Sequence, residues 1–239
     1  MPNMERAPKF AAIMQPTFLP WVGYFALMDN VDLFVLLDDV QFDKRSWQQR
    51  NRILTAQGPL WLTIPVLTKG RRDQTIRDVE ILSDGKFPSG LLRTVELNYA
   101  KAPYFDRYFP AFEGILQAHA ERLCALNTAL IVWMAEAFGI KTPIVNASDT
   151  PVASAKAERL ADLCRAHTVS HYISPPGSKA YLDESDAFDE AAIALSYFHY
   201  VHPEYEQGGK AFEPYMSALD LLFHKGPDSL AILRSGVRS

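Results

Sequence analysis

The chain has 239 residues, of which 48% are hydrophobic and 22% charged. This mixture is typical of a globular protein and excludes a disordered or collagen-like chain. The formal net charge of −4 is unevenly distributed, because residues 44–77 carry a local charge of +7 and the remainder carries −11. The asymmetry argues against a general nucleic-acid surface and favours a confined basic site for a phosphorylated small molecule, with a solvated arginine-rich loop as the alternative.

The first third of the chain predicts a strand, a helix and a second strand. Residues 10–14 and 33–38 are short apolar runs of strand length, and the apolar spacing of residues 22–30 between them is helical. Residues 61–66 and 76–82 are also predicted as strands. Pro65 in the former suits the edge or end of a sheet better than its centre.

The rest of the chain alternates helices and strands. Helices are predicted over 88–97, 103–118, 121–138, 155–167 and 216–224, and strands over 142–146, 171–174 and 193–200. This alternation predicts a Rossmann-like α/β fold with a mostly parallel sheet flanked by helices. Without a repeat or linker-like stretch, we expect one domain over residues 1–239, with residues 85–139 as a helical subdomain over the sheet.

The cysteines and the apolar runs indicate in which cellular compartment the protein is expected. Cys124 and Cys164 lie in apolar helical patterns, which favours two buried thiols in a reducing environment. Charged residues interrupt every apolar run before it reaches the length of a membrane span, and the amino terminus lacks a signal-like apolar core. We therefore expect a cytoplasmic protein without membrane insertion, whose oligomeric state the sequence leaves open.

The loop between the first strand and the first helix is the first candidate binding segment. A helix amino terminus and a glycine can cradle a phosphate or carboxylate there. Alternatively, the prolines stiffen a plain connection whose aromatic rings cap the core. No glycine-rich phosphate fingerprint is present. The candidate ligand-binding residues of this loop are Gln15, Pro16, Trp21 and Gly23.

Two carboxylates follow the second strand. Asp38 and Asp39 lie where a carboxylate can project over the sheet edge to bind a metal, hold a hydroxyl or act as a base, although an aspartate also favours a turn at this position. We favour Asp38. With Lys44 and Tyr24 it forms the candidate catalytic set.

The basic stretch combines cations with an aromatic ring and an amide, a set suited to recognising a phosphate and a ring. Its candidate ligand-binding residues are Trp47, Arg50, Asn51 and Arg52. If this piece is extended, the two arginines share one face and Asn51 points the other way, so at least one of the three is structural.

Two later segments are weaker candidates. Tyr99 and Lys101 lie on a loop between helices that can form a lid, although aromatic packing explains the phenol equally well. Ser174, Lys179 and Tyr181 follow a strand and a Pro-Pro-Gly turn, which is either a phosphate loop or only a turn. The scattered histidines have no zinc-ligand spacing, so no protein metal site is predicted. Whether Mg²⁺ accompanies a nucleotide is left open.

One set of motifs carries a family resemblance, and its residues lie in 15–24, 32–44, 47, 50–52, 62–66, 99–105, 172–174, 179–183, 202–207 and 217–223. With these motifs the chain resembles the WbqC-like protein family over nearly its whole length. The resemblance implies a place in bacterial gene sets for surface polysaccharide, notably O-antigen. His224 departs from the pattern, which has an asparagine there.

A fainter resemblance is to nucleotidyltransferases with a His-x-Gly-His motif, in which Trp21 and Tyr24 replace the two histidines. Neither ring can stabilise charge on a phosphate as an imidazolium does, so either the chemistry differs or only binding remains. The leading hypothesis is a transferase acting on a nucleotide-linked or otherwise activated small molecule. The alternatives are a non-catalytic nucleotide- or partner-binding module, and an aminoacyl or acyl transferase that decorates an amino sugar.

Overall fold

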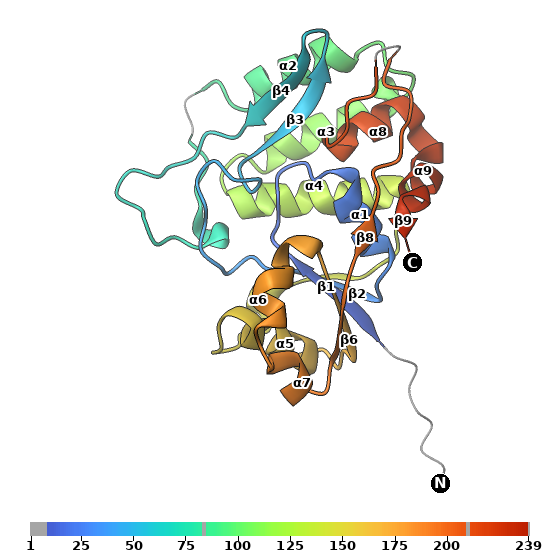
Figure 1. Cartoon of the computed structure of the whole chain (residues 1–239). Helices are drawn as coiled ribbons and strands as arrows, with labels where there is room; N and C mark the ends of the chain where they lie inside the picture. Colours follow the sequence, from blue (N-terminus) through green and yellow to red (C-terminus); the bar gives the residue numbers. More distant parts are fainter. Residues whose placement is uncertain (1–8, 83–84, 209–210, 239) are drawn as a thin grey trace.

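A five-stranded parallel sheet forms the centre of the molecule (Figure 1). The computed structural model describes residues 9–82, 85–208 and 211–238. The strand order β5-β2-β1-β6-β7 confirms the predicted Rossmann-like α/β class. The strands are β1 (Phe10–Met14), β2 (Leu33–Leu36), β5 (Ile144–Asn146), β6 (His171–Ser174) and β7 (Ala194–Tyr197).

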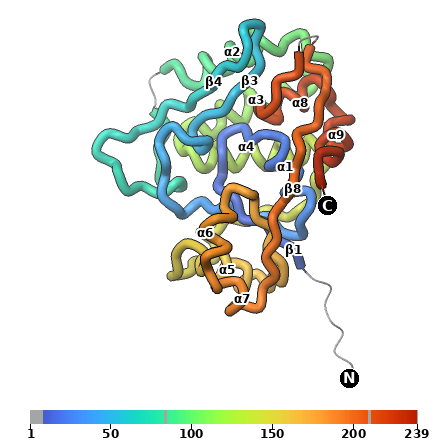
Figure 2. The backbone as a smooth tube through the Cα atoms, viewed as in Figure 1, coloured from blue at the N-terminus to red at the C-terminus, as the bar shows by residue number. Residues whose placement is uncertain are grey.

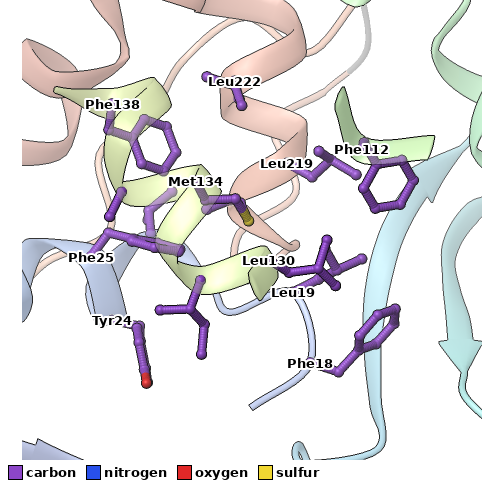
Figure 3. Packing of buried hydrophobic residues seen from close by; sticks show 14 of the residues in the cluster. Phe18, Leu19, Tyr24, Phe25, Phe112, Leu130, Met134, Phe138, Leu219 and Leu222 are labelled. Carbon is purple, nitrogen blue, oxygen red and sulfur yellow. The ribbon is translucent and has the colours of Figure 1, made fainter. Parts of the chain in front are cut away.

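Side chains alternate between the two faces of this sheet, and each face has its own apolar cluster. Ala12 and Phe34 belong to the larger cluster, with α1 (Val22–Asp29) and α4 (Leu123–Phe138). Figure 3 shows part of that cluster. Ala11 and Leu33 face the smaller cluster, with α5 (Lys156–Ala166) and α7 (Ala187–Glu190). The remaining helices are α2 (Ser89–Tyr99), α3 (Phe105–Ala118), α6 (Lys179–Asp183), α8 (Ala218–Lys225) and α9 (Ser229–Ser235).

Local sequence signals explain where the long helices begin and end. Helix α4 ends at Gly139, whose φ of 84° lies in the left-handed region that glycine adopts without strain. Ser217 caps α8, because its hydroxyl accepts a hydrogen bond from the backbone N–H of Leu219. The predicted helices 88–97, 103–118, 121–138, 155–167 and 216–224 therefore have their counterparts in α2, α3, α4, α5 and α8.

Two small antiparallel pairs lie outside the central sheet. Strands β3 (Arg50–Thr55) and β4 (Gly58–Thr63) form a hairpin beside α2 and α8. Strands β8 (His199–Tyr200) and β9 (Val237–Arg238) form the other pair. Figure 2 shows the chain after β7 running as an extended segment past α1 towards α8, so residues distant in the sequence meet near the hairpin.

The predicted strand over residues 76–82 is wrong in its first half. Residues Ile76–Asp78 form a 3-10 turn, η1, because burying both Ile76 and Val79, three residues apart, suits a helical turn. Only isolated bridges at Glu80 and Ile81 follow. The other 3-10 turns are η2 (Ala147–Asp149), η3 (Pro176–Ser178) and η4 (Gly226–Asp228).

Short elements were the hardest to predict. Helices α6, α7 and α9 have four to seven residues each and no prediction matched them. The predicted strand over 193–200 is divided between β7 and β8. Within the described ranges, no helix has both the length and the hydropathy needed to cross a bilayer. The single domain with a helical subdomain over residues 85–139 stays a prediction.

Candidate functional site

A two-lobed cleft lies beside the carboxyl ends of β1 and β6. The chain leaves β1 towards β2, and β6 lies on the opposite side of β1, so this edge is the switch point at which open α/β sheets bind ligands. Two cavities of about 320 and 300 Å³ share Met14, Thr17 and Trp47 in their walls. We call them the β6 lobe and the Trp21 lobe.

The two lobes have different linings. The β6 lobe is neutral, and its polar groups include amides, hydroxyls and two phenols. It is lined by Ile13, Met14, Gln15, Thr17, Leu37, Ser46, Trp47, Gln48, Leu160, Tyr172, Pro175, Ser178 and Tyr181. The Trp21 lobe is more aromatic and contains one cation. It is lined by Met14, Thr17, Pro20, Trp21, Tyr24, Trp47, Asn51, Arg52 and Tyr215.

Asn51 holds the loop that joins β1 to α1. Its buried amide donates to the carbonyl oxygens of Phe18 at 3.1 Å and Leu19 at 2.7 Å, and its Oδ1 accepts from the backbone N–H of Arg52 at 2.8 Å. The φ of Leu19 is 44°, a conformation that costs free energy in a non-glycine residue. The backbone N–H of Phe18 also donates to the Trp47 carbonyl. Asn51 therefore fixes the conformation of the loop whose residues line the cleft.

Gly23 makes room for the indole of Trp21. A Cβ atom added at Gly23 would lie 2.3 Å from that ring, so a larger residue would displace it. The close approach that we expected an anion to use is thus occupied by the protein's own side chain. The indole also contacts the rings of Tyr200, His202 and Tyr215, which fixes its orientation at the wall of the cleft.

The arginines of β3 lie over an aromatic ring at the rim of the cleft. The hairpin pairs Arg52 with Trp61, and Arg50 is on the same face. The guanidinium carbons of Arg50 and Arg52 lie 4.4 and 5.8 Å from the Trp61 ring centroid, and Trp47 packs on Trp61 at 5.2 Å. The Nε atoms of both arginines are buried and without a hydrogen-bond partner. In the described part of the chain, neither arginine is within 4.0 Å of a carboxylate.

Tyr24 lies at the base of the Trp21 lobe. Its hydroxyl donates to the carbonyl of Gln15 at 3.2 Å, and Figure 3 shows it pointing away from the apolar cluster. Burial raises the pKa of Tyr24 well above its usual range, so the phenol stays protonated at neutral pH. Tyr24 can therefore donate a hydrogen bond or hold the loop, but it is not suited to act as a base.

Gln15 and Pro16 follow β1 directly. Gln15 is exposed in the β6 lobe, and its Oε1 accepts a hydrogen bond from Gln48 at 2.9 Å, which orients the amide. The carbonyl of Pro16 accepts from the buried amide of Asn127 at 3.0 Å. Gln15 is thus available to a ligand, whereas Pro16 is buried and holds the loop.

Asp38 does not reach either lobe. It is buried, and its two oxygens accept hydrogen bonds from the backbone N–H and the hydroxyl of Ser148 at 2.9 and 2.6 Å. It lines a separate groove of about 750 Å³ beside α4. The neighbouring Asp39 forms an ion pair with Arg159. The geometry gives Asp38 a role in joining β2 to η2, and its catalytic role stays a prediction.

The remaining residues of the predicted cation and phosphate loops are distributed around the cleft. Tyr181 lines the β6 lobe, whereas Ser174 is fully buried and does not line it. Lys179 forms an ion pair with Asp183 at 2.7 Å and lies over the Tyr197 ring, outside the lobe lining. Lys44 is exposed and does not line either lobe.

Tyr99 and Lys101 belong to a different place. They line a cavity of about 240 Å³ formed with Leu54, Asp220 and other residues beyond the hairpin. Tyr99 is buried, and its hydroxyl accepts from the backbone N–H of Leu54 and donates to Asp220. The structure therefore separates these two candidates from the cleft.

Three aromatic residues at the cleft were not predicted: Trp61, Tyr172 and Tyr215. The sequence could have predicted Trp61 if residues 50–63 had been interpreted as one hairpin, because the register of that hairpin pairs Trp61 with Arg52. Tyr215 is brought in by the return of the chain to α8, and no local sequence signal marks it. Tyr215 has a φ of 61° and is 52% exposed, and tertiary structure rather than local sequence decides both values.

Comparisons with known proteins identify the family of the chain. The profile of the WbqC-like protein family matches residues 15–232. The uncharacterized protein Rv1507c of Mycobacterium tuberculosis (strain ATCC 25618 / H37Rv) is 40% identical over 229 residues, which is 95% of this chain and 98% of that protein. No solved structure matches the chain significantly. The chain belongs to the WbqC-like protein family.

Proposed function

We propose that this protein is a transferase that binds a nucleotide-linked or otherwise activated small molecule in the two-lobed cleft, within bacterial surface polysaccharide (O-antigen) assembly. The observation that carries the proposal is the position of the cleft at the switch point of the sheet, together with its lining of aromatic rings and a guanidinium. Phosphorylated ligands need cations, and their rings need flat apolar partners.

In this proposal, each of the two lobes recognises a different part of the ligand. Arg52, assisted by Arg50 at the rim, holds the phosphate, and Trp47 or Trp21 stacks against a ring. The neutral amides and hydroxyls of the β6 lobe, with Gln15 foremost, hydrogen-bond the sugar or small-molecule part. Gly23 and Pro16, which line neither lobe, position these groups without touching the ligand, and Asn51 both lines the Trp21 lobe and holds the loop.

The residues that line the cleft show whether the chain itself could hold a metal ion there. No aspartate or glutamate lines either lobe, and the described residues contain no cluster of three or more histidine, cysteine, aspartate or glutamate side chains able to hold an ion. Protein carboxylates therefore do not fit a Mg²⁺ site in the cleft. We propose that a Mg²⁺ ion arriving with a nucleotide is held by the phosphates and water rather than by the chain.

A second candidate is a binding module without catalysis. It is favoured by the same lining, because the lobes contain neither a carboxylate nor a histidine that can move a proton. The two candidates share a ligand and differ only in turnover. Incubation with the bound donor and a panel of amino-sugar acceptors, followed by mass spectrometry, separates them.

A thermal-shift screen tests the shared claim, because a ligand that binds the native state raises the melting temperature. The panel comprises nucleotides, nucleotide sugars, coenzyme A and amino acids, with and without Mg²⁺. We expect a shift from one phosphorylated class, and expect Arg52→Ala to abolish it. Arg72→Ala is the matched control, because this exposed arginine belongs to the same basic stretch but does not line the cleft. If both variants lose the thermal shift equally, the shift reflects the net charge of the basic stretch and not binding at Arg52. No shift with any phosphorylated ligand would refute the proposal.

A further inference from the structure

Arg50 and Arg52 form a pair of neighbouring cations on β3. They are alternate residues of one strand, so their side chains project from the same face. Among residues 9–82, 85–208 and 211–238, no carboxylate lies within 4.0 Å of either guanidinium. Two cations this close repel each other, and an anion between them relieves the repulsion. The pair therefore favours negative charge that a ligand supplies.

The indole of Trp61 holds both guanidinium groups. The Cζ atoms of Arg50 and Arg52 are 4.4 and 5.8 Å from the centroid of that ring. An indole attracts a guanidinium through the negative face of its π system, and the planar cation stacks well on it. The register of the hairpin fixes this arrangement, because Trp61 lies directly opposite Arg52.

An indole and a carboxylate orient an arginine with different electrostatic consequences. A carboxylate cancels the charge that it holds, whereas an aromatic ring leaves the guanidinium its full charge and its donors. In the described ranges, Arg52 donates one side-chain hydrogen bond, to the Tyr215 carbonyl at 3.3 Å, and Arg50 donates none. Stacking on Trp61 therefore fixes the two cations while most of their terminal N–H groups stay available to an anion.

Trp61 itself does not line the cleft. It is absent from the walls of both lobes, whereas Arg52 lines the Trp21 lobe. The Trp61 ring packs at 5.2 Å against Trp47, which lines both lobes, and 42% of Trp61 remains exposed. Trp61 can therefore act on a ligand in the cleft through the arginines rather than by direct contact.

We propose that Trp61 is a positioning residue that holds Arg50 and Arg52 as one binding site for a diphosphate group. Each guanidinium directs its paired N–H donors at one of the two phosphates, and Arg52 places the group at the Trp21 lobe. A single phosphate would engage one guanidinium and leave the other cation without a partner. The inference rests on the proposed function and specifies its ligand class, a small molecule that is activated through a diphosphate.

Isothermal titration calorimetry with sodium pyrophosphate and sodium phosphate tests the site, in metal-free buffer with sodium chloride holding the ionic strength constant. We expect pyrophosphate to bind at least about tenfold more tightly than phosphate, because it engages a second guanidinium. Arg50→Ala should remove most of that preference and change phosphate affinity by less than about threefold. Arg72→Ala is the matched control, because it removes one exposed charge of the same basic stretch outside the cleft, and it should leave the preference intact.

Variants of Trp61 test the positioning role. Trp61→Leu removes the ring but keeps an apolar side chain, and it should weaken pyrophosphate binding by about tenfold. Trp61→Phe keeps an aromatic face, should lose only about threefold, and provides the measurement if the leucine variant does not fold. In Arg50→Ala, the Trp61→Leu change should cost less than about threefold, because part of the stack is already gone. A purely structural Trp61 would give equal losses in both backgrounds.

Three outcomes would overturn the site: pyrophosphate that binds no more tightly than phosphate, affinity that is unchanged in both Trp61 variants, or a preference that Arg72→Ala removes as fully as Arg50→Ala. Failure of the proposed function has a different signature, because the probe is pyrophosphate alone. Binding of pyrophosphate at the arginines without turnover of any activated donor refutes the transferase and supports the site. Turnover without a preference for pyrophosphate refutes the site and leaves the transferase intact.

Discussion

Replacing Asn51 with alanine should destabilise the protein strongly, although Asn51 is a single polar residue of a hairpin strand. The side chain is 3% exposed and makes three hydrogen bonds, two of them to the loop that contains the strained Leu19. The substitution removes these bonds and leaves the two loop carbonyls without their buried donor.

The magnitude follows from those bonds. Each contributes about 0.5–1.5 kcal/mol net, and an unsatisfied buried carbonyl adds to the cost, so we expect a loss of about 2–4 kcal/mol in the free energy of unfolding. For a chain of this size, a loss of about 3 kcal/mol lowers the melting temperature by about 6–12 °C. The loop should also shift, because its conformation depends on this side chain, and ligand binding in the Trp21 lobe should weaken.

Urea unfolding followed by circular dichroism measures the change, with the slope of the transition compared between variants. Asn98→Ala is the matched control, because the same chemical change occurs at an exposed helical residue that makes one hydrogen bond to the Thr94 carbonyl. It should alter stability by less than about 0.5 kcal/mol. Equal losses in the two variants, or a loss below about 1 kcal/mol for Asn51→Ala, would refute the assignment of Asn51 as the support of the loop.

Three further predictions concern the cleft wall and the buried titratable groups. Gly23→Ala should force the Trp21 indole out of place and cost about 1–3 kcal/mol, seen as a lower melting temperature with altered tryptophan fluorescence, and an unchanged protein would contradict the packing. Burial raises the pKa of Cys124 to about 11 and that of Cys164 to about 12, so at pH 8 both thiols should react slowly with Ellman's reagent until the protein is unfolded; rapid native reaction would be the contrary result. Burial, with Asp220 nearby, also raises the pKa of Tyr99 well above its usual range. Its contribution to stability is therefore complete below about pH 10 and is lost as the pH rises further, and a urea midpoint that falls no more steeply there than in Tyr99→Phe would contradict this.

The central sheet could be predicted because its strands are short apolar runs with clear ends. Residues 10–14 and 171–174 match β1 and β6 as observed, and Gly139 marks the end of α4. Residues 76–82 were misjudged because burial of Ile76 and Val79 fits one turn of helix as well as a strand. Short helices such as α6 depend on tertiary packing and leave little periodicity to detect.

The candidate site could be predicted only where its residues follow β1 or belong to β3. Gln15 and Trp21 were found because a parallel sheet collects such residues at one edge. Arg52 was found because the basic stretch combines cations with an aromatic ring and an amide. Asp38 follows a neighbouring strand, but its direction out of the sheet, towards Ser148, is decided by packing against η2. The partnership of Tyr99 with Asp220 joins residues 121 positions apart, which no local pattern encodes.

A crystal structure of the protein with the phosphorylated ligand that gives the largest thermal shift tests the central claim most directly. The account predicts that the ligand occupies the cleft beside β1 and β6, with its phosphate at Arg52 and a ring against Trp47 or Trp21. A ligand bound in the groove beside α4 that contains Asp38, with the cleft empty, would contradict it.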